Sequence, residues 1–197
     1  MSRVLRRVLI VEDDRALSAA LARLALIWCD DVTSVDGVEA ARRALANAPP
    51  ELLLVDLRLP DGSGFDVVEA ACATRPLPVI VAMSGQATPE DSFRLAHMGV
   101  RGWVTKPFTT EAITRAVETA RTQAPPLASI GAWCVGVAPM REVHRVLRWS
   151  MVDQAIALSA GNRSRAAQLL HVSRQAMQQV LRARDGAART RIRSTVR

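Results

Sequence analysis

Residues 8–14 read Val-Leu-Ile-Val-Glu-Asp-Asp, four apolar residues followed by three carboxylates. A short, continuous apolar run of this kind is typical of a parallel strand that is buried on both faces. Residues 52–55 repeat the pattern and are followed by Asp56. Three further runs, which are only near-continuous in their apolar character, are found at residues 32–35, 78–82 and 103–105. The sequence therefore predicts five strands, and two of them end in acidic residues.

Amphipathic stretches separate these strands. In the first stretch, Leu17, Leu21, Leu24 and Ala25 recur at helical spacing. The predicted helices cover residues 16–27, 38–46, 65–73, 89–98 and 110–121. Strands that alternate with helices in this way predict an α/β domain with a doubly wound, five-stranded parallel sheet.

The composition excludes two classes of protein. Hydrophobic residues make up 49% of the chain, which is too much for a fully disordered protein. The longest apolar run, residues 17–28, is interrupted by Arg23 and is too short to span a bilayer. We therefore expect a cytoplasmic protein that does not bind membranes.

In a doubly wound sheet, ligands bind outside the carboxyl ends of the strands. The residues expected there are Glu12, Asp13, Asp14, Asp56, Ser84, Thr105 and Lys106. Clustered carboxylates repel one another unless a cation joins them, and oxygen ligands at a phosphate-handling site favour Mg²⁺. A carboxylate beside a metal ion and an ammonium group can attack a phosphoryl group and form an acyl phosphate. This edge therefore predicts a magnesium-dependent phosphorylation site.

Lys106 is the single lysine among the 26 basic residues of the chain, and the others are all arginine. A compact ammonium on a flexible stem can move between a carboxylate and a phosphate, whereas a guanidinium is larger and geometrically rigid. The lone lysine therefore indicates a chemical requirement at this position.

These motifs resemble the receiver domain of two-component response regulators. The motifs that carry the resemblance are residues 8–14, 54–62, 83–85 and 105–108, in the family's order and spacing. The resemblance implies that a histidine kinase phosphorylates Asp56. It also implies that Asp13 and Asp56 bind Mg²⁺, that Glu12 acts mainly through a metal-bound water, and that Arg58 offers its backbone carbonyl to the metal.

The same resemblance assigns roles in holding and sensing the phosphoryl group. Lys106 would hold it, and Ser84 would move in to hydrogen-bond it. The family couples this hydroxyl to an aromatic residue on the fifth strand, which implies that Trp103 is the switch residue; simple core packing of Trp103 is the alternative. The Lys106–Pro107 peptide bond would be cis. Arg58 and Gln86 adjoin the pocket and neither is a general base, so we expect slow hydrolysis.

The charge of the chain is unevenly divided. Residues 1–122 carry a net charge of −2 and residues 123–197 a net charge of +9. A strongly basic segment suggests nucleic acid as its partner, although a merely soluble basic surface is the alternative.

We expect a receiver domain at residues 1–123, a Pro/Gly linker at 124–139, a DNA-binding domain at 140–185 and a basic disordered tail at 186–197.

The DNA-binding domain is expected to be a small all-α unit with a helix-turn-helix. Helices are predicted at residues 140–158 and 164–170, and a third helix begins after Ser173. Residues 161–174 resemble the Fis-type helix-turn-helix, with His171 where that family has a glycine at a turn that favours positive φ. The candidate DNA-binding residues are Ser173, Arg174, Gln175, Gln178, Gln179 and Arg182. Glutamine can pair with adenine and arginine with guanine, whereas a solvated helix face is the alternative.

In the Fis family the preceding helix pairs two subunits, which implies that residues 140–158 form a dimer surface. The apolar stripe of that helix could equally belong to the core of its own domain. A receiver joined directly to such a module resembles the short redox- and photosynthesis-type regulators of proteobacteria.

We therefore expect a phosphorylation-controlled transcription regulator that binds double-stranded DNA as a homodimer. It would assist only its own phosphorylation and dephosphorylation, and so would not be an enzyme. Two alternatives remain open. One is a phosphorelay or protein-interaction switch without specific DNA binding, and the other is an architectural DNA-binding protein.

Overall fold

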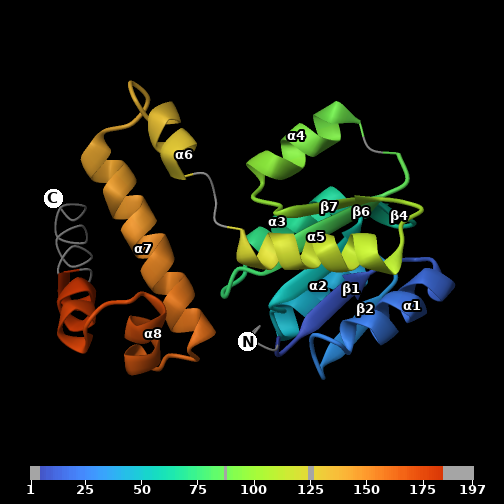
Figure 1. The fold of residues 1–197 in the computed structure, drawn as a ribbon, viewed down its shortest axis with the longest axis horizontal. Coiled ribbons are helices and arrows are strands. Elements are labelled where there is room, and N and C mark those ends of the chain that lie inside the picture. The colour runs from blue at the N-terminus through green and yellow to red at the C-terminus, as the bar shows by residue number, and fades with distance from the viewer. Residues whose placement is uncertain (1–4, 87, 124–126, 184–197) are drawn as a thin grey trace, which may run out of the picture. The chain divides into compact units, whose positions relative to one another are not determined.

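The computed structural model describes residues 5–86, 88–123 and 127–183 (Figure 1). The chain divides into two compact units, residues 1–127 and residues 128–197. The predicted tail at residues 186–197 lies outside the described residues. Within the described ranges, no helix has the length and apolar character needed to cross a membrane.

The first unit is built on a five-stranded parallel sheet, as predicted. Its strands stand in the order β2-β1-β3-β6-β7. They are β1 (Val8–Val11), β2 (Val32–Val35), β3 (Leu52–Asp56), β6 (Val79–Ser84) and β7 (Gly102–Thr105). Parallel pairing joins every neighbouring pair. The carboxyl ends of β1, β3, β6 and β7 therefore meet at one edge of the sheet.

Five helices cover the two faces of this sheet. They are α1 (Arg15–Ala25), α2 (Val38–Asn47), α3 (Gly64–Cys72), α4 (Pro89–His97) and α5 (Thr110–Thr122). Alternate residues of β1 point to opposite faces, so that Leu9 joins a core with α2, α3 and α4, while Ile10 joins a core with α1 and α5. Burial on both faces explains why the central strands β1, β3 and β6 read as continuous apolar runs, whereas the edge strand β2 exposes Thr33 and Ser34.

A small hairpin that the sequence patterns did not predict follows β3. It pairs β4 (Arg58–Leu59) with β5 (Gly62–Ser63) in antiparallel register. Gly64 comes directly after it, where a Cβ atom would lie 2.0 Å from the backbone carbonyl oxygen of Asp56. Only glycine allows α3 to begin this close to the end of β3.

The second unit is helical. It contains most of α6 (Leu127–Trp133), together with α7 (Met140–Leu158), α8 (Arg163–Leu169) and a further helical segment over residues 174–183. Helix α6 lies inside the predicted Pro/Gly linker at residues 124–139, where no helix was predicted. Its small and apolar residues lie among prolines and glycines, which obscured the helical signal in the sequence. The described parts of the linker are thus partly helical.

The turns of the predicted helix-turn-helix have the expected backbone. His171 has φ 53°, in the left-handed region where the resemblance expects glycine. Gly161 has φ 81° after the end of α7. The Ser173 hydroxyl accepts a hydrogen bond from the backbone N–H of Ala176 at 3.1 Å and so caps the segment at 174–183.

The apolar side chains of α7 differ in how deeply they are buried. Val152 and Ala155 are buried in a small core that also contains Ala167 of α8 and Met177. In contrast, Met151 remains 58% exposed. The helix therefore contributes to the core of its own unit and still presents apolar side chains to solvent.

Candidate functional site

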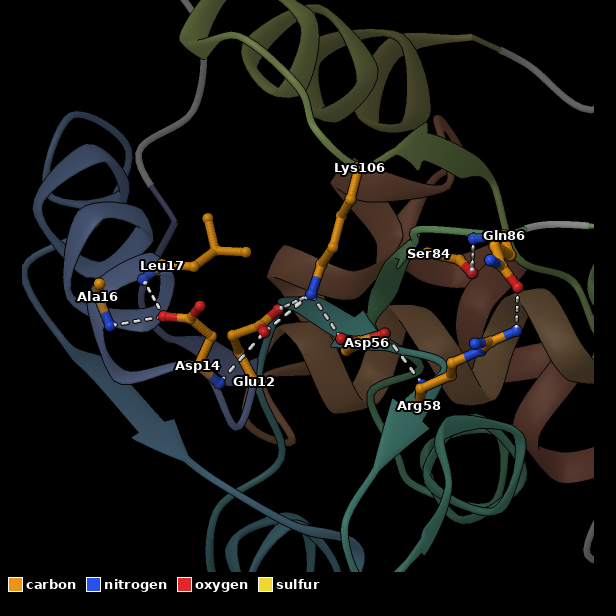
Figure 2. A network of polar contacts seen from close by, with 9 residues as sticks. All are labelled: Glu12, Asp14, Ala16, Leu17, Asp56, Arg58, Ser84, Gln86 and Lys106. Carbon is orange, nitrogen blue, oxygen red and sulfur yellow. Dashed lines mark hydrogen bonds and ion pairs between the residues drawn. The ribbon is translucent and has the colours of Figure 1, made fainter.

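Four strand ends bring the predicted site residues of the first unit together (Figure 2). Glu12 follows β1, Asp56 ends β3, Ser84 ends β6 and Lys106 follows β7. The Lys106 Nζ atom lies 2.6 Å from Glu12 Oε2 and 2.5 Å from Asp56 Oδ2. The lone lysine is thus the cation that joins two carboxylates at the centre of the site.

Burial makes these charges strongly interdependent. Glu12 and Asp56 are 2% and 6% exposed. Burial raises the pKa of Glu12, although the contacts with Lys106 oppose this rise. Burial by itself would lower the pKa of Lys106, but its hydrogen bonds to Asp56 and Glu12 outweigh that effect and raise the pKa. Lys106 is therefore a stable ammonium at neutral pH.

The Asp56 carboxylate is held from both sides. The backbone N–H of Arg58 donates to Asp56 Oδ1 at 2.9 Å, and Lys106 donates to Oδ2. The close start of α3 at Gly64 holds the backbone that leads away from Asp56. Because two donors orient it, the carboxylate has a defined direction at the mouth of the site.

The acidic residues at this edge form a possible cation site. Glu12, Asp13 and Asp56 each offer a carboxylate oxygen, and these three atoms lie within 4.8 Å of one another. Asp13 is exposed, whereas the other two are buried. Hard oxygen ligands with one member open to solvent fit Mg²⁺, which keeps several waters when bound.

Asp14, which the strand-end argument grouped with these residues, has a different task. Its Oδ1 accepts hydrogen bonds from the backbone N–H groups of Leu17 and Ala16, at 3.0 and 2.8 Å (Figure 2). These two bonds lower the pKa of Asp14. The third carboxylate after β1 therefore caps α1 and points away from the site.

Ser84 and Trp103 lie at neighbouring strands. Ser84 is 1% exposed, and its hydroxyl accepts a hydrogen bond from the backbone N–H of Gln86 at 3.3 Å. Trp103 is half-buried against the sheet core and donates from Nε1 to the Thr105 hydroxyl at 3.2 Å. The Lys106–Pro107 peptide bond is cis, as the resemblance implies.

Two polar contacts were not anticipated from the sequence. The Arg58 Nη2 atom donates to Gln86 Oε1 at 3.0 Å. The Asp61 carboxylate, in the turn between β4 and β5, accepts hydrogen bonds from the backbone N–H groups of Val38 and Glu39, at 2.7 and 3.1 Å. It thereby caps the start of α2. The partners are more than 20 positions apart in each case, so no local pattern indicated either contact.

A second candidate site lies on the helical unit. Its helical segment at residues 174–183 turns Met177 inward, with Val180 and Leu181 packed beside it. The exposed positions include all the predicted DNA-binding residues, namely Ser173, Arg174, Gln175, Gln178, Gln179 and Arg182. Two arginines and three glutamines thus share a solvent-facing surface.

Comparison with known proteins gives one matching family model and many relatives. Residues 8–118 match the model of the response regulator receiver domain. The chain is 30% identical over 180 residues to the photosynthetic apparatus regulatory protein RegA of Rhodobacter capsulatus, covering 91% of this chain and 92% of that protein. It is 27% identical over 181 residues to the acid tolerance regulatory protein ActR of Rhizobium meliloti, covering 89% and 86%. The non-phosphorylated HemR receiver domain from Leptospira biflexa has 27% identity and a TM-score of 0.55, covering 61% of this chain and 98% of that domain.

Proposed function

Because the chain belongs to the response regulator receiver family, we propose that it is a transcription regulator controlled by phosphorylation of Asp56. A histidine kinase would be the phosphoryl donor and double-stranded DNA the target. The observation that carries this proposal is the position of the Lys106 ammonium, 2.6 Å from Glu12 and 2.5 Å from Asp56 at the carboxyl edge of the sheet.

The reaction follows from the positions of these groups. An Asp56 carboxylate oxygen attacks the phosphorus of a phosphohistidine. The new O–P bond makes Asp56 an acyl phosphate, while the P–N bond breaks and the histidine imidazole is the leaving group. Lys106 can turn its ammonium from Glu12 and Asp56 toward the transferred oxygens and neutralise their charge. Mg²⁺ held by Glu12, Asp13, Asp56 and the Arg58 carbonyl would supply further positive charge to these oxygens. No external substrate is turned over, so the protein would not act as an enzyme.

Transmission to the second unit would begin at Ser84. Its hydroxyl would leave the Gln86 N–H and bind a phosphoryl oxygen, and Trp103 would exchange its half-buried position for a more buried one. The position of Trp103 supports this proposal, since it lies on β7, the strand that leads to Lys106, and its Nε1 donates to the hydroxyl of Thr105 at the end of that strand. The phosphorylated protein would then bind DNA as a homodimer in the cytoplasm.

DNA recognition is assigned to the segment at residues 174–183. Its exposed Gln175, Gln178 and Gln179 offer amides for adenine edges, while Arg174 and Arg182 suit guanine or phosphate. The capped, positively charged start at Ser173 would enter the major groove first. The exposed part of α7, which includes Met151, would form the dimer surface.

One observation favours a second candidate function. Trp133, Val135 and Val137 are between 72% and 81% exposed, and exposed apolar groups of this size often mark protein interfaces. The helical unit could therefore bind another protein in a switch or relay without specific DNA binding.

A mobility-shift titration separates these functions. Wild type and Asp56→Asn are compared on genomic and random DNA, each with and without acetyl phosphate and Mg²⁺. We expect phosphorylation to strengthen sequence-specific binding by wild type alone. Lack of any DNA binding at low salt would instead favour the protein-interaction switch. Sequence-blind binding that ignores phosphorylation would indicate an architectural DNA-binding protein.

A further inference from the structure

Arg58, at the start of β4, and Gln86, which follows β6, join two segments of the proposed phosphorylation site (Figure 2). The Arg58 backbone N–H donates to Asp56 Oδ1 at 2.9 Å, while its side-chain Nη2 donates to Gln86 Oε1 at 3.0 Å. The backbone N–H of Gln86 donates in turn to Ser84 Oγ at 3.3 Å. A continuous chain of hydrogen bonds thus runs from Asp56 through Arg58 and Gln86 to Ser84.

The charge of Arg58 also acts on the first turn of α4. Hydrogen bonds from Thr88 make the largest contribution to lowering the pKa of Asp91 in the first turn of α4, and the charge of Arg58 adds to it. Through its hydrogen bond to Gln86, the Arg58 side chain bridges from the residues after β3 to the segment that carries Ser84.

The acceptor of this guanidinium hydrogen bond is the neutral amide oxygen of Gln86, a weaker partner than an anion. A phosphoryl group on Asp56 would carry a charge of about −1.5 to −2 only two residues from Arg58. A guanidinium bonded to a phosphate gains the attraction between two opposite charges, which the neutral amide oxygen of Gln86 does not offer, and the planar fork of arginine matches phosphate oxygens. The phosphoryl group would outcompete Gln86 for Arg58.

We propose, on the basis of the proposed phosphorylation of Asp56, that Arg58 exchanges partners when the site is loaded. Its guanidinium leaves Gln86 and binds the phosphoryl oxygens. The same movement releases Gln86, and with it the loop whose backbone N–H is bonded to the Ser84 hydroxyl. Arg58 is thereby a phosphoryl-binding residue through its side chain, in addition to the backbone role that the family resemblance implies.

The test uses beryllium fluoride, which binds carboxylates as a phosphoryl mimic, with Mg²⁺ and the full chain. Bound fluoride is measured by fluorine NMR during a titration. The variants are Arg58→Ala, Gln86→Ala and the double variant, with Arg58→Lys as the conservative change. Both side chains are exposed, so we expect the fold to be kept, and circular dichroism checks this. Arg43→Ala is the matched control, since that arginine is 69% exposed on α2.

Partner exchange predicts opposite effects at the two positions. Arg58→Ala should raise the half-saturating concentration about tenfold, through loss of a charge-assisted hydrogen bond. Gln86→Ala should lower it about two- to threefold, because no existing bond must be broken first. The double variant should resemble Arg58→Ala, and Arg58→Lys should fall between Arg58→Ala and wild type.

Three results would overturn the proposal. If Arg58→Ala titrates like wild type and Arg43→Ala, the side chain does not bind the mimic. If Gln86→Ala weakens binding as much as Arg58→Ala does, the two residues stay bonded to each other when the mimic binds, and no exchange of partners takes place. In both cases the phosphorylation of Asp56 would stand. If wild type binds no more fluoride than Asp56→Asn does, the proposed function fails together with this inference.

Discussion

Replacing Lys106 by methionine removes the ammonium between two buried carboxylates and keeps a side chain of similar length. The carboxylates of Glu12 and Asp56 retain only 1% and 8% of their side-chain exposure, so neither can be solvated in its place. Removing one partner of a buried ion pair costs about 3–5 kcal/mol. Because the Lys106 side chain is itself 20% exposed, we expect the lower end, a loss of about 3 kcal/mol in unfolding free energy near neutral pH without divalent cations.

The loss should depend on pH with a definite sign. The folded-state pKa of Glu12 is raised above 4.5 by burial, so its ionisation destabilises the fold, and the fold regains stability as pH falls through this raised pKa. Without Lys106 the opposing contacts are gone and the pKa rises further. The difference between wild type and Lys106→Met should therefore shrink as pH falls from neutral toward 4.5.

Urea unfolding in EDTA, followed by tryptophan fluorescence, measures this difference. Trp28 is 7% exposed in the core of the first unit and reports its unfolding. Arg43→Met is the control for loss of an exposed cation. Added Mg²⁺ should restore part of the stability of Lys106→Met, because it supplies charge among the same carboxylates. Equal unfolding free energies of Lys106→Met and wild type in EDTA would refute the ion-pair reasoning.

Three further predictions concern the backbone and the proposed DNA-binding surface. Gly64→Ala places a Cβ atom 2.0 Å from the Asp56 carbonyl oxygen, and we expect about 3 kcal/mol of destabilisation in urea unfolding together with lower phosphorylation by acetyl phosphate; an unchanged midpoint would contradict this. His171→Gly relieves a left-handed backbone at φ 53° and should stabilise the helical unit by about 1 kcal/mol in thermal unfolding, whereas a loss of stability would contradict the strain argument. Arg174→Ala should weaken DNA binding by about tenfold at fixed salt, and Gln178→Ala should also change the preferred sequence in a binding-site selection. Equal binding by wild type and both variants would exclude this helix as the reading surface.

Much of the first unit could be predicted from the chain because its signals are local. The strands β1 and β2 begin and end at the predicted residues; β3 and β7 differ by one position at one end, and β6 differs by one position at its start and two at its end. The exact ends depend on pairing: β6 continues to Ser84 because Met83 and Ser84 pair with Val104 and Thr105 of β7. In the second unit, α7 has its predicted limits, whereas α6 was missed because proline and glycine surround a helix of only seven residues.

By itself, the sequence determined which residue types stand at the strand ends, since an apolar run followed by acid is visible over a few positions. The tertiary structure decided which of them act together. Glu12 and Lys106 are 94 positions apart and meet only because β1, β3, β6 and β7 end at one edge. Asp14 is only two residues from Glu12, but its carboxylate accepts hydrogen bonds from backbone N–H groups at the start of α1 and is therefore not available at that edge. The bond between Arg58 and Gln86 likewise joins β4 to the residues after β6, which come together only in the folded sheet. Local periodicity describes each element separately, whereas contacts between side chains depend on the order in which the elements pack.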